Sequence, residues 1–301
     1  MRTRLICGLA LVGLSLCATR LPAEILYGTD DLNGLFTFDS ANASAATRVA
    51  ITGLQNGETL VGIDVRPATG VLYGIGSTSR LYTLNTATGA ATQVGAAGAF
   101  TISGTRFGVD FNPIPDRIRL VSDADQSLRI NPNDGTLSGT DTSLSPVSSS
   151  VVAAAYDRNF FRGGPPATDP TPTTLFGIDN VGGTLVRIGG VDGTPSPNGG
   201  VVTTVGSLGL GTGLNDEINF DISGSGVAFA SLQNGGFGST NIYSINLSTG
   251  GATLLGTVGN GGVGAPPTLT GLAAASFVPE PATVSLLAGV AFAGLVARRR
   301  R

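Results

Sequence analysis

A unit of four short segments, from Gly62 to Gly95, is repeated along the chain and constrains its fold more than any other feature. The unit opens at residues 61–66, where apolar and other residues alternate with the period of two that is typical of a β-strand. Further strands are predicted at residues 71–75, 81–85 and 91–95. Turn sequences such as Pro67-Ala68-Thr69-Gly70 separate them. One such meander buries too little apolar area to be stable alone, so its copies must pack on one another.

The first strand of the unit recurs four times. FGVDFNP at residues 107–113 repeats VGIDVRP at residues 61–67, and further copies are VAAAYD at 152–157, INFDI at 218–222 and TGLAAAS at 270–276. The mature chain begins with a second-strand sequence at Ile25 and ends with an isolated first strand. We therefore predict an all-β fold, a five-bladed β-propeller of four-stranded antiparallel blades, whose C-terminal strand completes the first blade and closes the ring. An additional degenerate blade at residues 138–150 or 256–267 is the alternative.

The N-terminal end has the pattern of a secretory signal peptide. Two arginines, Arg2 and Arg4, precede an apolar run from Leu5 to Cys17. We predict a signal peptide at residues 1–23, a propeller domain at 24–277 and a C-terminal tail at 278–301. Both cysteines of the chain lie in the signal peptide, so the mature domain is expected to have no disulfide.

The tail combines a short motif, an apolar segment and a basic end. Its motif is Pro279, Glu280 and Pro281, its apolar segment is residues 282–297, and its basic end is Arg298, Arg299, Arg300 and Arg301. This arrangement resembles the PEP-CTERM sorting signal of Gram-negative bacteria. The resemblance implies export across the inner membrane, transient anchoring there by a transmembrane helix, recognition by an exosortase, and delivery to the cell surface or extracellular matrix. An ordinary tail anchor is the alternative.

The repeats themselves resemble a known family. The sequences LYGT, GIDVRPATGVLYGI, LYTLNTATGAAT and GVDFNP are similar to those of an uncharacterised bacterial family, domain of unknown function 4394, which is often exported with a PEP-CTERM tail. The resemblance covers nearly all of the mature domain. It implies a single domain and no established activity.

The composition excludes several kinds of chemistry. The chain has no histidine, lysine or tryptophan, which excludes Ser-His-Asp catalysis, Schiff bases, histidine-ligated zinc and the P-loop. Between Glu24 and Phe277 there are 10 arginines and 19 acidic residues, a balance of −9. A nucleic-acid partner is therefore not expected.

Three aspartates occupy the same position of three first strands and are the candidate site residues. Asp64, Asp110 and Asp221 are expected to meet at the central axis, where three carboxylates repel one another unless something compensates their charge. They are interpreted in three ways: as ligands of an axial Ca²⁺, as the acid/base pair of a glycosidase, or as structural residues that bond backbone N–H groups or the nearby Arg66 and Arg106. No cofactor is expected apart from such an ion.

Two weaker patterns have ordinary structural explanations. Residues 123–127 begin like a calcium loop but lack its glycine and later glutamate, which favours a solvated turn. The five tyrosines, Tyr27, Tyr73, Tyr82, Tyr156 and Tyr243, fall in strands, which favours packing between blades over a sugar platform.

Together these features favour an exported, surface-sorted and non-catalytic propeller that binds exopolysaccharide or a matrix or surface protein. The alternative is a carboxylate-dependent glycosidase or lyase that acts on extracellular polysaccharide. A membrane contact is expected through the C-terminal tail before its removal.

Overall fold

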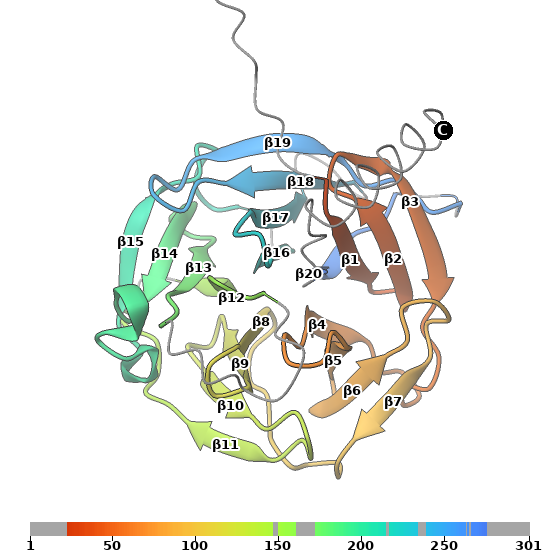
Figure 1. The fold of residues 1–301 in the computed structure, drawn as a ribbon, viewed down its shortest axis with the longest axis horizontal. Helices are drawn as coiled ribbons and strands as arrows, with labels where there is room; N and C mark the ends of the chain where they lie inside the picture. Colours follow the sequence, from red (N-terminus) through yellow and green to blue (C-terminus); the bar gives the residue numbers. More distant parts are fainter. Residues whose placement is uncertain are drawn as a thin grey trace, which may run out of the picture.

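The computed structural model describes residues 23–146, 150–160, 172–214, 217–233, 239–262, 264 and 266–275. These residues form five four-stranded antiparallel sheets arranged around a central axis (Figure 1). The predicted five-bladed propeller is confirmed. The predicted signal peptide, apart from its last residue, and the predicted sorting tail lie outside the described residues. Within the described part of the chain, no helix is long and apolar enough to cross a membrane.

Each blade adds its strands from the axis outward. The first blade consists of β20 (Leu269–Ala274), β1 (Ile25–Asp30), β2 (Gly34–Asp39) and β3 (Asn42–Ala50). The second consists of β4 (Leu60–Val65), β5 (Leu72–Gly76), β6 (Arg80–Leu84) and β7 (Ala91–Val94). The third consists of β8 (Phe107–Asn112), β9 (Arg117–Ser122), β10 (Ser127–Ile130) and β11 (Leu137–Thr140).

The last two blades carry the longer insertions. The fourth consists of β12 (Val151–Tyr156), β13 (Leu175–Asp179), β14 (Thr184–Ile188) and β15 (Val202–Ser207), with the short 3₁₀ turns η1 (Val191–Gly193) and η2 (Pro197–Gly199) between its third and fourth strands. The fifth consists of β16 (Ile218–Ile222), β17 (Ala228–Gln233), β18 (Thr240–Ile245) and β19 (Ala252–Thr257).

The C-terminal strand closes the ring as predicted. β20 pairs antiparallel with β1, and Leu26 lies opposite Ala274. The first blade is thus built from both ends of the domain, which removes an exposed sheet edge. The segments considered for an extra blade instead contain β11 and the end of β19, and the described residues form no sixth sheet there.

The apolar core lies between neighbouring blades. Tyr73 and Ile75 of the second blade pack against Phe107 and Phe111 of the third, and the rings of Tyr73 and Phe111 meet edge to face at 5.3 Å. This contact confirms packing between blades for Tyr73. The outermost strands β3, β7, β11, β15 and β19 lie at the perimeter and are largely exposed (Figure 1).

Small residues let the five innermost strands approach one another at the axis. A Cβ atom on Gly108 would lie 2.4 Å from the backbone nitrogen of Ala154, and one on Gly62 would lie 2.5 Å from Cγ2 of Val109. The cavity left beside these glycines measures about 10 Å³, close to the least that one water molecule needs. At the level of these glycines the axis is therefore nearly filled by protein, whereas a cavity of about 180 Å³ lies at the start of β4, β8 and β16.

Candidate functional site

The structure brings the three predicted aspartates together on the axis. Asp64, Asp110 and Asp221 lie near the ends of β4, β8 and β16 and are 1%, 0% and 2% exposed. One carboxylate oxygen of each lies within 4.8 Å of those of the other two. This position follows from the period of two along each strand, which directs each aspartate to the same side as the residue two positions earlier, Gly62, Gly108 or Asn219.

The aspartates connect the innermost strands of all five blades. Five of their six oxygens accept hydrogen bonds from backbone N–H groups, and the donors are Val65 (2.6 Å), Phe111 (2.6 Å), Tyr156 (3.0 Å), Ile222 (2.6 Å) and Ala274 (2.5 Å). Val65, Phe111 and Ile222 directly follow the three aspartates. Tyr156 and Ala274 occupy the equivalent position in the other two blades. Asp64, for example, bonds Val65 of its own strand and Phe111 of the next blade.

The sixth oxygen is different. Asp110 Oδ2 is buried and has no hydrogen-bond partner among the described residues, although the Asp110 and Asp221 carboxyl groups lie within hydrogen-bonding reach of each other. The side chain of Asn159, which is also buried, hydrogen-bonds Asp64, and its Oδ1 likewise has no partner in the described part of the chain.

Burial dominates the protonation behaviour of this cluster. Desolvation raises the pKa of Asp64 and Asp110 well above the usual value for an aspartate, and repulsion from the neighbouring carboxylates adds to the effect. Desolvation also raises the pKa of Asp221, to about 6, although hydrogen bonds from Ala274 and Ile222 oppose it. A fully ionised cluster therefore needs a compensating charge.

The structural interpretation of the aspartates is supported for the backbone donors but not for Arg66. The Arg66 guanidinium forms a buried ion pair with Asp116 and donates to the Tyr73 hydroxyl at 3.3 Å. In the calcium-like turn, Asp123 accepts the N–H of Thr105 at 2.8 Å, as a structural turn residue does. The acid/base interpretation receives no support, because buried carboxylates held by backbone N–H groups are closed to a sugar ring.

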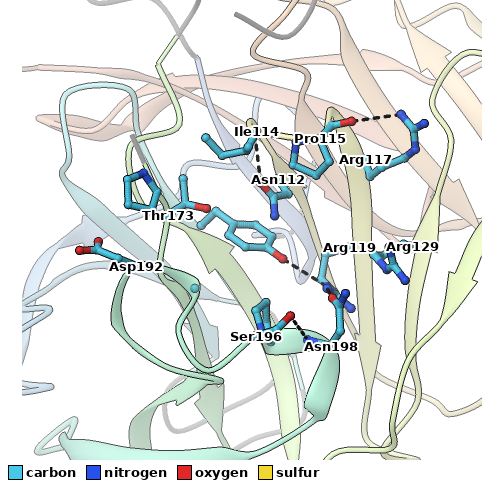
Figure 2. Close-up of a pocket in the computed structure, with 14 residues that line it drawn as sticks. Asn112, Ile114, Pro115, Arg117, Arg119, Arg129, Thr173, Asp192, Ser196 and Asn198 are labelled. Carbon is cyan, nitrogen blue, oxygen red and sulfur yellow. Dashed lines mark hydrogen bonds between the residues drawn. The ribbon is translucent and has the colours of Figure 1, made fainter. Parts of the chain in front are cut away.

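A pocket of about 330 Å³ lies between the third and fourth blades (Figure 2). Its lining includes Asn112, Arg117, Arg119 and Arg129 from the third blade and Tyr156, Thr173, Asp192, Ser196 and Asn198 from the fourth. The described lining thus contains three arginines and one carboxylate. Arginines are therefore concentrated in a pocket that also has apolar walls, such as Ile114 and Pro197, in a domain that is acidic as a whole.

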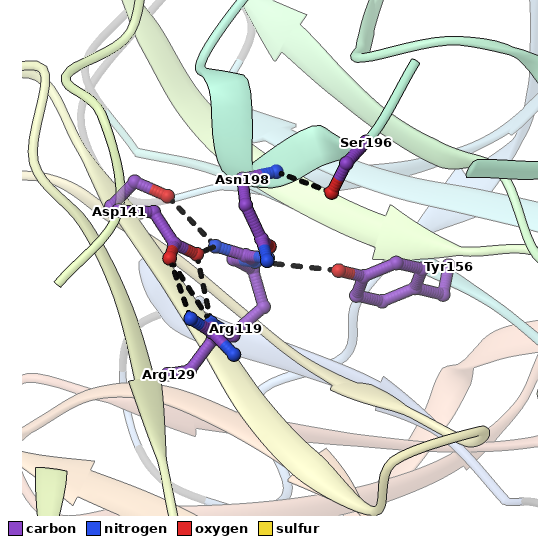
Figure 3. Close-up of polar contacts among 7 residues, drawn as sticks. Arg119, Arg129, Asp141, Tyr156, Ser196 and Asn198 are labelled. Atoms are coloured by element: carbon purple, nitrogen blue, oxygen red, sulfur yellow. Dashed lines mark hydrogen bonds and ion pairs between the residues drawn. The ribbon is translucent and has the colours of Figure 1, made fainter. Parts of the chain in front are cut away.

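Arg119 is the buried centre of the pocket wall (Figure 3). It donates to the Tyr156 hydroxyl at 3.3 Å and to Asn198 Oδ1 at 2.6 Å, and it pairs with Asp141. Arg129 binds the same carboxylate through two nitrogens, at 2.9 and 2.8 Å. Burial alone would lower the pKa of Arg119, but its contacts with Tyr156 and Asp141 raise the pKa, so the guanidinium is charged.

Tyr156 connects the pocket to the axis. Its backbone N–H donates to Asp110, while its hydroxyl accepts from Arg119. Sequence reasoning placed Tyr156 between blades and did not identify this pocket. Arg117, Arg119 and Arg129 alternate with apolar residues along β9 and β10, but the opposite wall comes from insertions that have no counterpart in the other blades.

Comparisons with known proteins identify the repeats and the tail. Residues 34–273 match the family described as "Domain of unknown function (DUF4394)", and residues 277–301 match the PEP-CTERM protein-sorting motif. A search of the curated proteins found no significant match.

Solved structures with similar architecture are distant in sequence. A Lactobacillus plantarum protein is 10% identical with a TM-score of 0.43, over 84% of this chain and 99% of its own. A Bacteroides thetaiotaomicron protein of unknown function is 14% identical with a TM-score of 0.43, over 77% and 58%. A putative 6-phosphogluconolactonase from Bacteroides uniformis is 13% identical with a TM-score of 0.38, over 78% and 82%. Such distant similarity carries no information about activity.

Proposed function

We propose, starting from the fact that this chain belongs to the DUF4394 family and carries a PEP-CTERM sorting motif, that its propeller is a non-catalytic binding module for an acidic extracellular polysaccharide. The motif marks the protein as exported and surface-sorted through a C-terminal signal that an exosortase recognises. The proposed binding site is the pocket between the third and fourth blades.

The concentration of arginines in this pocket is the observation that carries the proposal. Arg117, Arg119 and Arg129 line it, while the domain as a whole has a balance of −9. Arg119 is saturated by protein contacts. Arg117 bonds backbone carbonyls through one nitrogen and Arg129 pairs with Asp141, but Arg117 is partly exposed and the Arg129 side chain is 34% exposed, so each has further N–H groups to donate. A carboxylate-bearing sugar would find charge-assisted hydrogen bonds here and repulsion over most of the remaining surface.

The other lining groups suit a saccharide. Asn112, Thr173 and Asn198 provide amide and hydroxyl groups (Figure 2), while Tyr156 is buried in the wall and its hydroxyl accepts a hydrogen bond from Arg119 (Figure 3). The volume of about 330 Å³ is near the lower end of the range of about 300–1,000 Å³ that is common for small-molecule sites. The pocket therefore fits a short segment of a polymer rather than an extended chain.

Two alternatives make different predictions. A matrix or surface protein as partner would use a larger surface than this pocket, since a stable protein interface buries about 800 Å² on each side. A glycosidase would need two carboxyl groups about 5–10 Å apart on either side of the sugar. Asp192 is the one carboxyl-bearing side chain that the described pocket lining provides.

Calorimetric titration of the full chain in mild detergent tests the proposal. We expect saturable binding of oligogalacturonate and none of a neutral cello-oligosaccharide of the same length. Arg117→Ala and Arg129→Ala should each weaken binding about 10- to 100-fold, the effect of losing a charged hydrogen bond of about 1.5–3 kcal/mol. The matched control is Arg80→Ala in the second blade, where Arg80 contacts Thr78.

Equal binding of the neutral oligosaccharide, or an equal loss in the Arg80→Ala variant, would contradict an acidic-sugar pocket. Affinity for a surface protein without affinity for either oligosaccharide would favour the protein partner instead.

A further inference from the structure

The carboxylates on the axis of the propeller have one more oxygen than there are backbone N–H donors to them. Three carboxylates provide six oxygens, whereas the five innermost strands present one N–H group each at this level, and all five are bonded to the carboxylates. Asp110 Oδ2 is the oxygen left over. Two alanines, Ala155 and Ala273, stand where the other two blades could have carried an aspartate.

A second buried oxygen without a partner belongs to a side chain that contacts the cluster. Asn159 is 3% exposed, and its side-chain amide hydrogen-bonds Asp64. Its Oδ1 has no partner among the residues that the structure describes. Because a buried polar atom without a partner costs about 1–3 kcal/mol, two of them beside one carboxylate cluster indicate a missing ligand.

A positively charged ligand would satisfy both oxygens and compensate the repulsion between the ionised carboxylates. The Asp110 and Asp221 carboxyl groups face each other at hydrogen-bonding distance, and neither brings a donor when ionised. Arg66, the cation nearest to Asp64 in the sequence, is held by Asp116 instead. No arginine is among the groups that bond Asp64, Asp110 or Asp221 in the described part of the chain.

The geometry suits a hard divalent cation. One oxygen from each aspartate lies within 4.8 Å of the others, which is about the largest separation of two ligands that are each about 2.4 Å from one ion. Carboxylate oxygens and amide carbonyl oxygens such as Asn159 Oδ1 are the ligand types that Ca²⁺ prefers. We propose that Asp64, Asp110, Asp221 and Asn159 bind one Ca²⁺ on the propeller axis.

The proposed ion would join the first strands of three blades and the segment after β12. It lies behind the pocket wall, since the N–H of Tyr156 bonds Asp110 and the hydroxyl of the same residue bonds Arg119. The inference does not depend on the proposed sugar ligand, because it uses none of the arginines that would bind a sugar.

The test measures calcium binding and thermal unfolding of the full chain in mild detergent. We expect equilibrium dialysis with ⁴⁵Ca²⁺ to find one ion per chain. At a free Ca²⁺ concentration of 100 times Kd, the Tm should be about 5 °C or more above its value in EDTA. The proposal is overturned if the dialysed chain retains no Ca²⁺ and its Tm is the same in Ca²⁺ and EDTA.

Asp110→Asn is the sharpest variant. The asparagine carbonyl can still accept the Tyr156 N–H, and its amide can donate to Asp221, so the fold should persist while a negative ligand is lost. We expect at least a tenfold loss of Ca²⁺ affinity and, at the same Ca²⁺ concentration, a calcium-dependent Tm shift that is no more than about half that of the native chain. Asn159→Ala keeps all three carboxylates and should weaken binding severalfold, which provides a second test if Asp110→Asn does not fold.

Asp125→Asn is the matched control. It makes the same substitution in the calcium-like turn, at a residue with φ of 59° that asparagine tolerates. Its Ca²⁺ affinity should equal that of the native chain. Unchanged binding in both Asp110→Asn and Asn159→Ala, or binding lost in Asp125→Asn, would place the ion elsewhere and overturn the axial assignment.

Discussion

At the scale of single residues, Glu58 shows how this chain buries a charge without a cation. It lies just before β4, is 1% exposed, and accepts hydrogen bonds from the Tyr82 hydroxyl at 2.5 Å, from the Gln55 N–H at 3.2 Å and from Thr78. Burial alone would raise the pKa of Glu58, but these hydrogen bonds outweigh it and lower the pKa below the usual value. Burial, together with the hydrogen bond to the Glu58 carboxylate, raises the pKa of Tyr82 to about 12.

This balance predicts a pH-dependent stability. A carboxyl group whose pKa is lower in the folded than in the unfolded chain stabilises the fold above its unfolded pKa, and the contribution is lost as the pH falls through the folded pKa. Glu58→Gln should therefore destabilise the protein by about 2 kcal/mol at pH 7, since it weakens several charged hydrogen bonds. The difference from the native chain should shrink as the pH falls below about 4.5.

Urea unfolding at pH 7, 5 and 3.5 measures this difference. Asp31→Asn provides a control, because it also replaces a carboxylate by an amide but at an exposed turn residue. A Glu58→Gln effect that stayed constant over this pH range would show that the ionised form of Glu58 is not what the fold stabilises.

The two candidate sites, the axial aspartates and the arginine pocket, differ in how well the sequence predicts them. Asp64 and Asp110 stand 46 positions apart in the same short motif, so their meeting at the axis follows from the repeat alone. Each also accepts an N–H group from the next blade, and the register between blades is set by side-chain packing that the sequence pattern does not contain. The arginine pocket was not predictable in the same way, because one of its walls comes from the insertion that contains η1 and η2.

At the scale of elements, the packing of the innermost strands depends on positions that have no side chain. Gly108 in β8 faces the backbone of β12, and a Cβ atom there would lie 2.4 Å from the nitrogen of Ala154. Gly256 in β19 also lies in a strand, but a Cβ atom at that position meets nothing within 4 Å. The strand pattern is similar at both positions, yet the tolerance for a methyl group differs.

The two glycines therefore make a matched pair. Gly108→Ala should destabilise the fold by about 1–3 kcal/mol or more, because backbone on both sides would have to move. Gly256→Ala should change stability by less than about 1 kcal/mol, and in the stabilising direction, because alanine restricts the unfolded chain. Thermal unfolding of both variants measures the contrast. Equal Tm values would mean that the innermost strands are packed less closely than the structure shows.

The strands themselves were largely predictable, since each has a period of two and is bounded by Asn/Gly or Pro/Gly turns. The turn at residues 85–89 is an example: Asn85 Oδ1 accepts two backbone N–H groups, and Gly89 takes a φ of 73°. The β-bulges that bend several strands carry no such local signature, because they depend on how a strand fits its neighbour.

At the scale of the whole molecule, the fold depends on a strand contributed by the far end of the domain. β20 pairs with β1, and it also provides the Ala274 N–H to Asp221 and the Leu269 carbonyl to Asn219 at 3.0 Å. Without β20 the first blade would expose the edge of β1, and an Asp221 oxygen would lose its donor.

A pair of truncations tests this dependence. A chain that ends at Thr268 lacks β20 and should lose cooperative thermal unfolding and aggregate through the open edge of β1. A chain that ends at Ala275 keeps every described strand and should unfold at the same Tm as the full chain, since the sheets close without the sorting tail. Circular dichroism and size-exclusion chromatography measure both outcomes. If the shorter chain stayed monomeric and unfolded cooperatively at the native Tm, the ring would not need its closing strand, and stability would come from the contacts between adjacent blades alone.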